Sequence, residues 1–147
     1  MKIGIASDHR GYKLKQEIIK NLNNYEFVDY GTNSEESVDY PDFGFLLAEN
    51  VASQNVDYGV AICGSGIGIS IACNKVKKIR CAKVSSIEEA KITRIDNNSN
   101  IIAFSADVSV KDAISYVKIF LETEFSNIER HQKRIDKITK YEEKNEY

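Results

Sequence analysis

The sequence of 147 residues lacks the features that mark several large classes of protein. Its net charge is only −2, which gives no reason to expect nucleic acid or an anionic membrane as a partner. No apolar run approaches the length of a membrane-spanning helix, and the opening residues lack the apolar core of a secretory signal. We therefore expect a cytoplasmic protein that has neither nucleic acid nor a membrane as a partner.

Cysteine and histidine are scarce, and they show no metal or disulfide pattern. The three cysteines are Cys63, Cys73 and Cys81. Because their number is odd and no two form a Cys-x-x-Cys pair, we expect neither a disulfide framework nor a zinc site. No cluster of histidine, cysteine and carboxylate residues has the spacing of metal ligands. We expect free thiols, no metal and no other cofactor.

The most distinctive stretch that is present is 57–74, with the sequence DYGVAICGSGIGISIACN. Its apolar part, 58–62, has a bias to β-branched residues, which is typical of a strand buried on both faces. Three glycines come next at alternate positions, Gly64, Gly66 and Gly68, and a helix-compatible stretch, 67–74, begins among them. Such a loop leaves N–H groups open at a helix N-terminus, where the peptide dipoles favour negative charge. We predict a cradle for an anion at this loop.

Cys63 ends the predicted strand, where the same helix dipole would stabilise a thiolate. A free cysteine is more often a small buried apolar residue, so a structural role for Cys63 stays open at this point. The loop is not a Walker A motif, because no Gly-Lys-Ser/Thr ends it. It also misses the dinucleotide fingerprint, because Ile69 stands where the third glycine belongs. We take 57–74 as the chemical centre of the protein.

Strands and helices alternate along the chain. The expected strands are 2–7, 26–30, 58–62, 80–84 and 101–104. The expected helices are 11–23, 40–51, 67–74, 85–94 and a segment around 113–121. The alternation predicts a parallel sheet of five strands with helices on both faces, a Rossmann-like three-layer α/β/α sandwich. Since 147 residues suffice for one ordinary domain, we expect the whole chain, 1–147, to form it.

A charged helix is expected at 128–143, appended to this sandwich. Its apolar seam has heptad-like spacing and consists of Ile128, His131, Ile135 and Ile138. A narrow seam on an appended helix favours packing against a second subunit. Arg130 and Arg134 share an adjoining face, and by themselves they are more typical of a solvated helix. The last residues, 141–147, are expected to be frayed.

Several unusual residues fall at the carboxyl ends of strands, where parallel sheets of this kind bind ligands. Asp8 and His9 follow the first strand, and Cys63 ends the third. The sequence therefore predicts that one rim of the sheet carries the site.

Taken together, the motifs resemble one family of sugar-phosphate isomerases, which contains ribose-5-phosphate isomerase B and the galactose-6-phosphate isomerase subunits. The matching motifs run in family order over nearly the whole chain: Ser7-Asp8-His9-x-Gly11, Asp39-Tyr40-Pro41, 63–70, Asn74-Lys75, Asn97-x-x-Asn100 and Arg130-His131-x-x-Arg134. The resemblance implies an aldose–ketose isomerisation through a cis-enediolate, which needs one base, an oxyanion cradle and a phosphate clamp.

The resemblance also implies roles for residues of the first rim. Cys63 would be the base, and Ser65 would hydrogen-bond near the reacting end of the sugar. The N–H donors to the enediolate oxygen would come from the loop that contains Gly64, Gly66, Ile67 and Gly68. Asp8 would bind sugar hydroxyls, and Tyr40 would line the pocket.

Further roles implied by the resemblance concern the phosphate and a neighbouring chain. His9, Arg130 and Arg134 would hold the phosphate, since two guanidiniums one helical turn apart match its oxygens. The family forms a dimer or a dimer of dimers in which the neighbouring chain completes each site, and Asn97 would reach across that interface. Asp96 stands where the family often has a histidine that opens the furanose ring, and we expect Asp96 to take part in that step. Ile128-Glu129 replaces the family's Gly-Gly.

Three functions stay open at this stage. The leading one is the interconversion of D-ribose 5-phosphate and D-ribulose 5-phosphate. A close alternative is an isomerase of a six-carbon sugar phosphate, such as allose or galactose 6-phosphate, because pocket depth sets the length of the sugar. A third is a non-catalytic nucleotide- or sugar-phosphate-binding module in which Cys63 is structural. The combination of Cys63, the glycine cradle and two remote arginines favours an enzyme.

Overall fold

The sheet has five parallel strands, as the sequence predicts, and the structure shows their order to be β2-β1-β3-β5-β4. The computed structural model describes residues 1–144. The predicted fraying of 141–147 is wrong for 141–144, which continue the last helix to Lys144, and 145–147 lie outside the described residues. The strands are β1 (Lys2–Ser7), β2 (Glu26–Asp29), β3 (Tyr58–Cys63), β4 (Cys81–Lys83) and β5 (Ile101–Ser105).

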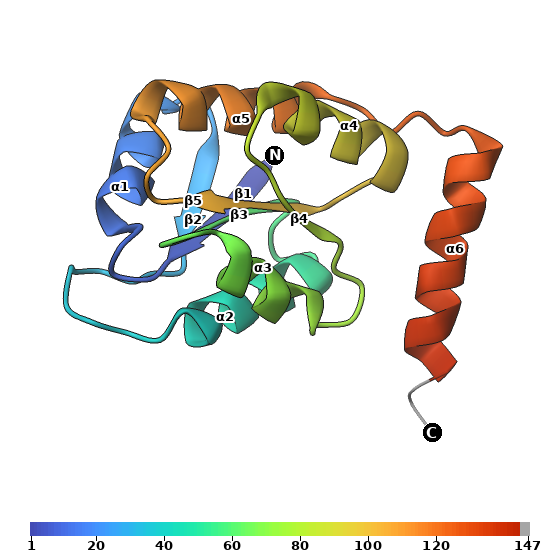
Figure 1. Ribbon diagram of the computed structural model, residues 1–147, viewed down its shortest axis with the longest axis horizontal. Helices are drawn as coiled ribbons and strands as arrows, with labels where there is room; N and C mark the ends of the chain where they lie inside the picture. The colour runs from blue at the N-terminus through green and yellow to red at the C-terminus, as the bar shows by residue number, and fades with distance from the viewer. Residues whose placement is uncertain (145–147) are drawn as a thin grey trace.

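Helices cover both faces of the sheet (Figure 1). They are α1 (Tyr12–Asn21), α2 (Tyr40–Ala52), α3 (Ile67–Asn74), α4 (Ile87–Asn97), α5 (Val110–Glu122) and α6 (Glu129–Lys144). Helices α2 and α3 lie on one face, whereas α1, α4 and α5 lie on the other, which confirms the three-layer sandwich. Within residues 1–144, no helix combines the length and the apolar character that crossing a membrane requires.

Alternate side chains of the central strand β3 build the two halves of the core. Val60 and Ile62 pack with α1, α4 and α5, whereas Ala61 and Cys63 pack with α2 and α3. This follows from the two-residue period of a strand that is covered on both faces. Cys63 is therefore fixed at its place by the packing of a completely covered strand.

The strand order changes direction between β1 and β3. Strand β2 lies on the outer side of β1, whereas β4 and β5 lie on the other side of the sheet, beyond β3. The N–H of Asp8 donates to the carbonyl of Ile62 at 3.2 Å, so the loop after β1 is joined to the end of β3. Asp8 and Cys63 thus meet at the carboxyl ends of adjacent strands. This is the switch point at which such sheets bind ligands.

Helix α4 is longer than the predicted 85–94 and ends at Asn97. Ser86 caps its start, with a side chain that accepts from the N–H of Glu89, as the Ser-Ser sequence suggests. Its end is set by Asn98, which takes the left-handed conformation with φ 45° and donates its N–H to Arg94. The correction matters because Asp96 and Asn97 belong to the last helical turn. Strand β4 is shorter than the predicted 80–84.

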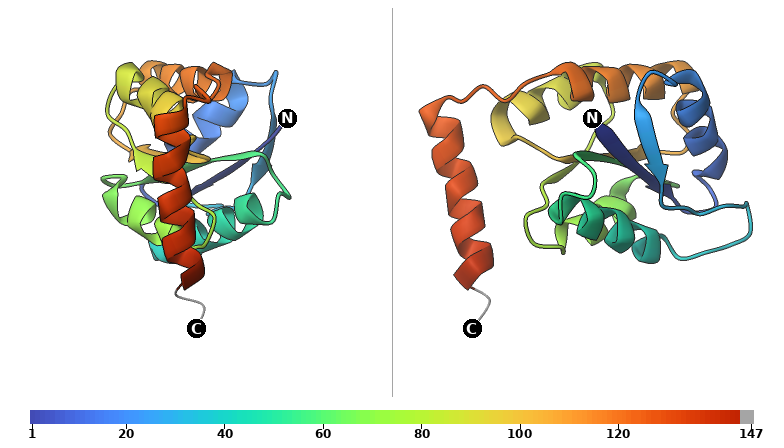
Figure 2. Two further views of the ribbon diagram at one scale, coloured as in Figure 1. Left: turned by 90° about the vertical axis from the view of Figure 1, so that its right-hand side faces the viewer. Right: turned by 180° about the vertical axis from the view of Figure 1, so that it is seen from behind.

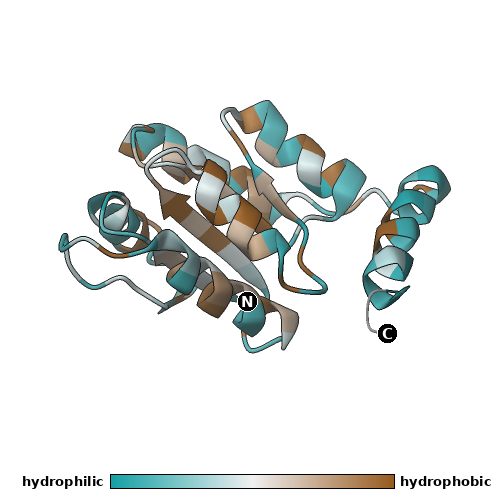
Figure 3. Cartoon of the chain, turned by 60° about the horizontal axis from the view of Figure 1, so that its bottom comes forward, coloured by the Kyte–Doolittle hydropathy of each residue, from teal (hydrophilic) through white to brown (hydrophobic). Residues whose placement is uncertain are grey.

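Helix α6 stands beside the sandwich as an appended element (Figure 2). It is largely hydrophilic, with isolated hydrophobic residues (Figure 3). The predicted seam divides in two: His131 and Ile135 are buried against the same chain, whereas Ile128 and Ile138 are 40% and 51% exposed. Glu142 adds a contact near the other end by accepting from the N–H of Lys78 at 3.2 Å. A second subunit at this seam stays a prediction.

Candidate active site

Cys63 lies at the floor of a pocket of about 430 Å³ at the carboxyl ends of the strands. The pocket is lined by Asp8, Arg10, Tyr40, Cys63, Gly64, Ser65, Ile67 and Gly68. We call this group, together with His9 and Gly66, the Cys63 half-site. The thiol is only 4% exposed, and the N–H of Gly66 donates to its sulfur with an N···S distance of 3.2 Å. A helix N-terminus and a directed N–H both favour negative charge on that sulfur.

Gly66 is the residue that makes this geometry possible. It precedes α3 with φ +77°, a left-handed conformation that side chains disfavour. A Cβ on it would lie 2.6 to 2.9 Å from the backbone atoms of Phe104 in β5. The loop therefore passes so close to the neighbouring strand that only glycine fits.

The loop side chains hold the cradle in place. Ser65 Oγ accepts from the N–H of Ile67 at 3.1 Å, so the predicted donor of Ile67 points toward the Ser65 hydroxyl. The ring of Tyr40 covers Gly68 so closely that a Cβ there would lie 2.5 Å from Tyr40 Cζ. Tyr40 lines the pocket, as the sequence analysis expects, and Gly68 allows the close approach.

Asp8 organises the loop after β1. Its Oδ1 accepts from the N–H groups of Arg10 at 3.0 Å and Gly11 at 3.1 Å, and the residue is only 6% exposed. Within residues 1–144 no protein donor reaches its other oxygen, Oδ2, so that atom can accept from a ligand hydroxyl. This is the chemistry that binding of a sugar requires.

His9 follows Asp8 and is half-buried. Its Nδ1 accepts from the N–H of Val38 at 3.2 Å, so the neutral ring carries its proton on Nε2. A ring fixed in this tautomer presents an N–H donor on its other side. The ring is not among the side chains that line the pocket, although its neighbours Asp8 and Arg10 are.

Arg10 is the pocket residue that sequence reasoning missed. Its guanidinium lies against Gly64, and the position of a Gly64 Cβ would be 2.7 Å from Arg10 Nη1. The available signal was the place of Arg10 directly after Asp8-His9, in a loop at a strand's carboxyl end. A lone cation in a loop is usually solvated, and the sequence does not show that this one lies beside Cys63.

A second group of predicted site residues lies at the opposite end of the strands, the amino ends. We call it the arginine half-site; it consists of Asp96, Asn97, Arg130 and Arg134. The link after α4 marks this end, because the Asn100 carbonyl accepts from Gly59 at the start of β3. Strand β3 has six residues, which at ~3.3 Å each separates the two ends by roughly 20 Å. One chain therefore does not bring Arg130 and Arg134 to the Cys63 half-site or to His9.

A chain of polar contacts joins α4 to the start of α6. His131 Nε2 lies 3.6 Å from Asp96 Oδ1, and His131 Nδ1 lies 2.9 Å from Ser126 Oγ. The N–H of Ser126 in turn donates to the carbonyl of Ile95. These contacts hold Asp96 beside the first turn of α6, from which Arg130 projects. Arg130 and Arg134 are both exposed.

Asn97 lines a second pocket of about 370 Å³ between the sandwich and α6. Arg80 lies in the same pocket and donates from Nε to the Asn97 carbonyl at 2.9 Å. Burial lowers the pKa of the Arg80 guanidinium, and nearby Glu142 opposes that shift. The contact with Cys73 and burial both raise the pKa of the Cys81 thiol in this pocket. Cys81 is therefore kept protonated.

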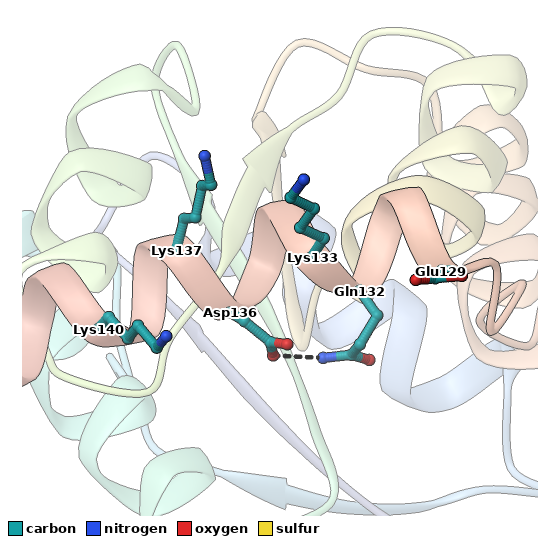
Figure 4. Close-up of a pocket in the computed structure, with 6 residues that line it drawn as sticks. All are labelled: Glu129, Gln132, Lys133, Asp136, Lys137 and Lys140. Atoms are coloured by element: carbon teal, nitrogen blue, oxygen red, sulfur yellow. Dashed lines mark hydrogen bonds between the residues drawn. The ribbon is translucent and has the colours of Figure 1, made fainter.

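A third hollow, of about 340 Å³, is lined by a single helix, α6 (Figure 4). Its residues are Glu129, Gln132, Lys133, Asp136, Lys137 and Lys140. Gln132 Nε2 donates to Asp136 Oδ1 at 2.7 Å, and the sandwich lies behind the helix in this view. Its charges have both signs, and it contains no residue of either half-site. We assign no chemistry to it.

The described residues 1–144 contain no group of three or more histidine, cysteine, aspartate or glutamate side chains placed to hold a metal ion. The Cys63 half-site offers a thiol, an amide-lined loop, a carboxylate and a guanidinium. Such a set is suited to moving a proton on a small anionic substrate.

The comparisons with known proteins agree with an α/β isomerase of this kind. The profile of the family described as Ribose/Galactose Isomerase matches residues 3–138, and the chain belongs to this family. Ribose-5-phosphate isomerase B of Escherichia coli K12 is 39% identical, with 97% of each chain covered.

Two solved structures are closely similar. The ribose-5-phosphate isomerase B of Clostridium thermocellum has a TM-score of 0.95 and 47% identity, with 99% of each chain covered. That of Mycoplasma genitalium with bound ribulose-5-phosphate has a TM-score of 0.90 and 41% identity, covering 97% of this chain and 96% of that chain. The expected family and fold are thus confirmed.

Proposed function

We propose that the protein interconverts D-ribose 5-phosphate and D-ribulose 5-phosphate. The observation that carries the proposal is the Cys63 thiol at the N-terminus of α3, which accepts from the Gly66 N–H in a pocket that also contains Asp8 and Ser65. Membership of the isomerase family and the ribulose-5-phosphate bound to the Mycoplasma genitalium relative support the choice of substrate.

In the proposed reaction, the Cys63 thiolate removes the proton from C2 of the open-chain aldose. The electrons of the C2–H bond form the C1–C2 double bond, and the aldehyde oxygen becomes the enediolate oxygen, which the loop N–H groups stabilise. The Cys63 thiol returns the proton to C1. A proton moves from O2 to O1, and we assign its transfer to Ser65, which lines the same pocket as Cys63. The base and the acid are thus one group used twice.

The arginine half-site takes part only if it comes from another copy of the chain, because roughly 20 Å separates the two ends of the strands. We therefore propose a homodimer, or a dimer of dimers, in which Arg130, Arg134, Asn97 and Asp96 of one copy complete the other copy's pocket. Ile67 and Ile71 on α3 support this arrangement, since they are 54% and 55% exposed beside the pocket. The substrate is a phosphate ester of central metabolism, so we also propose a cytoplasmic location.

The test is to incubate the purified protein with ribose 5-phosphate and to measure ketose formation, with allose 6-phosphate and galactose 6-phosphate in parallel. We expect turnover of the pentose phosphate. Faster turnover of a hexose phosphate would move the assignment to the six-carbon alternative. Binding without turnover of any of them would return the protein to the non-catalytic class.

The Cys63→Ala variant tests the base. We expect turnover to be abolished while the fold persists, because no other thiol faces the pocket. Cys81→Ala is the matched control, since it removes a thiol that lies in a different pocket. Full activity of Cys63→Ala would refute the role of Cys63 as the base.

A further inference from the structure

Arg10 brings a positive charge to the Cys63 half-site that no other side chain lining this pocket supplies. The only other charged residue among the lining side chains is Asp8. Within residues 1–144, no carboxylate, carbonyl or aromatic ring pairs with the Arg10 guanidinium. A guanidinium carries five N–H donors and no acceptor, so these donors can bind an anion in the pocket.

The position of Arg10 is set by the backbone. Its N–H donates to Asp8 Oδ1 at 3.0 Å, so the loop cannot move away from the end of β1 without losing that bond. The guanidinium lies against Gly64, with Nη1, Cζ and Cδ at 2.7, 3.1 and 3.2 Å from the place of a Gly64 Cβ. Because Gly64 follows Cys63 directly, the missing side chain lets the guanidinium lie next to the catalytic loop.

We infer that Arg10 binds the phosphate of the substrate, from the same chain that supplies Cys63. This inference rests on the proposed function. It means that the phosphate is held from both sides, by Arg10 of one chain and by Arg130 and Arg134 of the other.

Depth in the pocket favours the phosphate over the enediolate as the partner of Arg10. Cys63 is 4% exposed at the floor, where C1 and C2 of the sugar must lie, whereas Arg10 is exposed at the rim. The enediolate already has the N–H groups of the glycine loop. A sugar phosphate with its reacting end at the floor brings its phosphate toward the rim.

The chemistry of the two groups matches as well. A guanidinium offers two parallel N–H donors that fit two phosphate oxygens, and each charge-assisted bond is stronger than a neutral one. His9 is the preceding residue, and its Nδ1 is occupied by Val38, so its Nε2 donates outward. Arg10 and His9 together offer donors to one dianion.

The decisive variants are Arg10→Gln and Arg10→Lys, with Lys13→Gln as the matched control. Lys13 lies on α1, its side chain is 79% exposed, and it pairs with Glu35 at 3.3 Å outside the pocket. Arg10→Gln and Lys13→Gln remove the same unit of charge three residues apart, so a difference between them reports position rather than net charge.

Three quantities are measured for each variant: KM for ribose 5-phosphate, kcat, and the competitive inhibition constant of inorganic phosphate. For Arg10→Gln we expect KM and the phosphate inhibition constant to rise together by about tenfold or more, with kcat within about twofold. Arg10→Lys should partly restore KM and the phosphate inhibition constant, because an ammonium keeps the positive charge but lacks the two parallel N–H donors of a guanidinium. Lys13→Gln should match the unsubstituted protein.

An unchanged phosphate inhibition constant in Arg10→Gln would overturn the inference. A fall in kcat alone would overturn it too, because that result assigns the guanidinium to the enediolate. If the unsubstituted protein shows no turnover, the proposed function fails, and this result can be told apart from a failure of the Arg10 inference. In that case calorimetric binding of inorganic phosphate tests Arg10 directly, and equal binding by Arg10→Gln and Lys13→Gln would refute its role.

Discussion

Replacing Gly66 with alanine is the sharpest structural test of the cradle. Gly66 adopts φ +77° in front of α3, and its N–H donates to Cys63 Sγ. An alanine Cβ would meet the carbonyl carbon, Cα and oxygen of Phe104 at 2.6, 2.8 and 2.9 Å. These atoms belong to the backbone of β5, which is paired on both sides and cannot give way.

Two effects add up in the Gly66→Ala variant. The left-handed conformation costs an alanine about 1–2 kcal/mol. Forcing a methyl group against a fixed neighbour costs about 1–3 kcal/mol more. We therefore expect the free energy of unfolding to fall by about 2–5 kcal/mol, a large share of the ~5–15 kcal/mol typical of a domain. The alternative is a shifted loop, which withdraws the Gly66 N–H from Cys63 and lowers kcat.

Urea unfolding and steady-state kinetics of Gly66→Ala measure both effects. Gly64→Ala is the control for stability, because Gly64 does not have a left-handed φ and its Cβ would meet only the flexible side chain of Arg10. We expect that control to lose less than about 1 kcal/mol. The reasoning is refuted if Gly66→Ala is as stable as Gly64→Ala and keeps full activity.

Two further predictions concern the arginine half-site. Arg134→Gln should raise KM for ribose 5-phosphate by about tenfold or more through the lost charge-assisted bonds, whereas its neighbour Lys133→Gln should not; equal KM values would return Arg134 to a solvated role. Asp96→Asn should lower the initial rate with ribose 5-phosphate, whose ring must open, far more than the rate with ribulose 5-phosphate, which cannot close to a furanose. Unchanged rates in both directions would show that Asp96 is a spectator.

The fold and the loop around Cys63 could be predicted because their signals are local. Alternate glycines after a β-branched run predict the strand, loop and helix around Cys63, and the structure has them at β3 and α3. The end of α4 could not be placed from apolar periodicity, because it is set by the conformation of one residue, Asn98.

Arg94 shows why the burial of charged residues escapes such an analysis. By sequence it is a basic residue in the last turn of a helix, which is typical of an exposed position. In the structure it is 4% exposed, with its guanidinium 4.9 Å from the ring of Tyr58 and 5.6 Å from that of Phe120. Nη1 donates to the carbonyl of Ser99 at 2.6 Å. These partners come from β3, α5 and a loop, so only the fold brings them together. Arg10 is exposed rather than buried, and it was missed because only the fold places its guanidinium against Gly64.

The placement of the two half-sites at opposite ends of the strands has a consequence for how activity depends on concentration. A folded single copy would hold Cys63 at one end of the strands without the arginine half-site, and the arginine half-site at the other end without Cys63. Dilution below the dissociation constant of the proposed dimer would then reduce the activity per molecule, although every subunit stays folded. Substrate that bridges two copies would oppose this loss, because a ligand that binds only the assembled form stabilises it by mass action. The supply of sugar phosphate would thereby help to set how much of the protein is assembled.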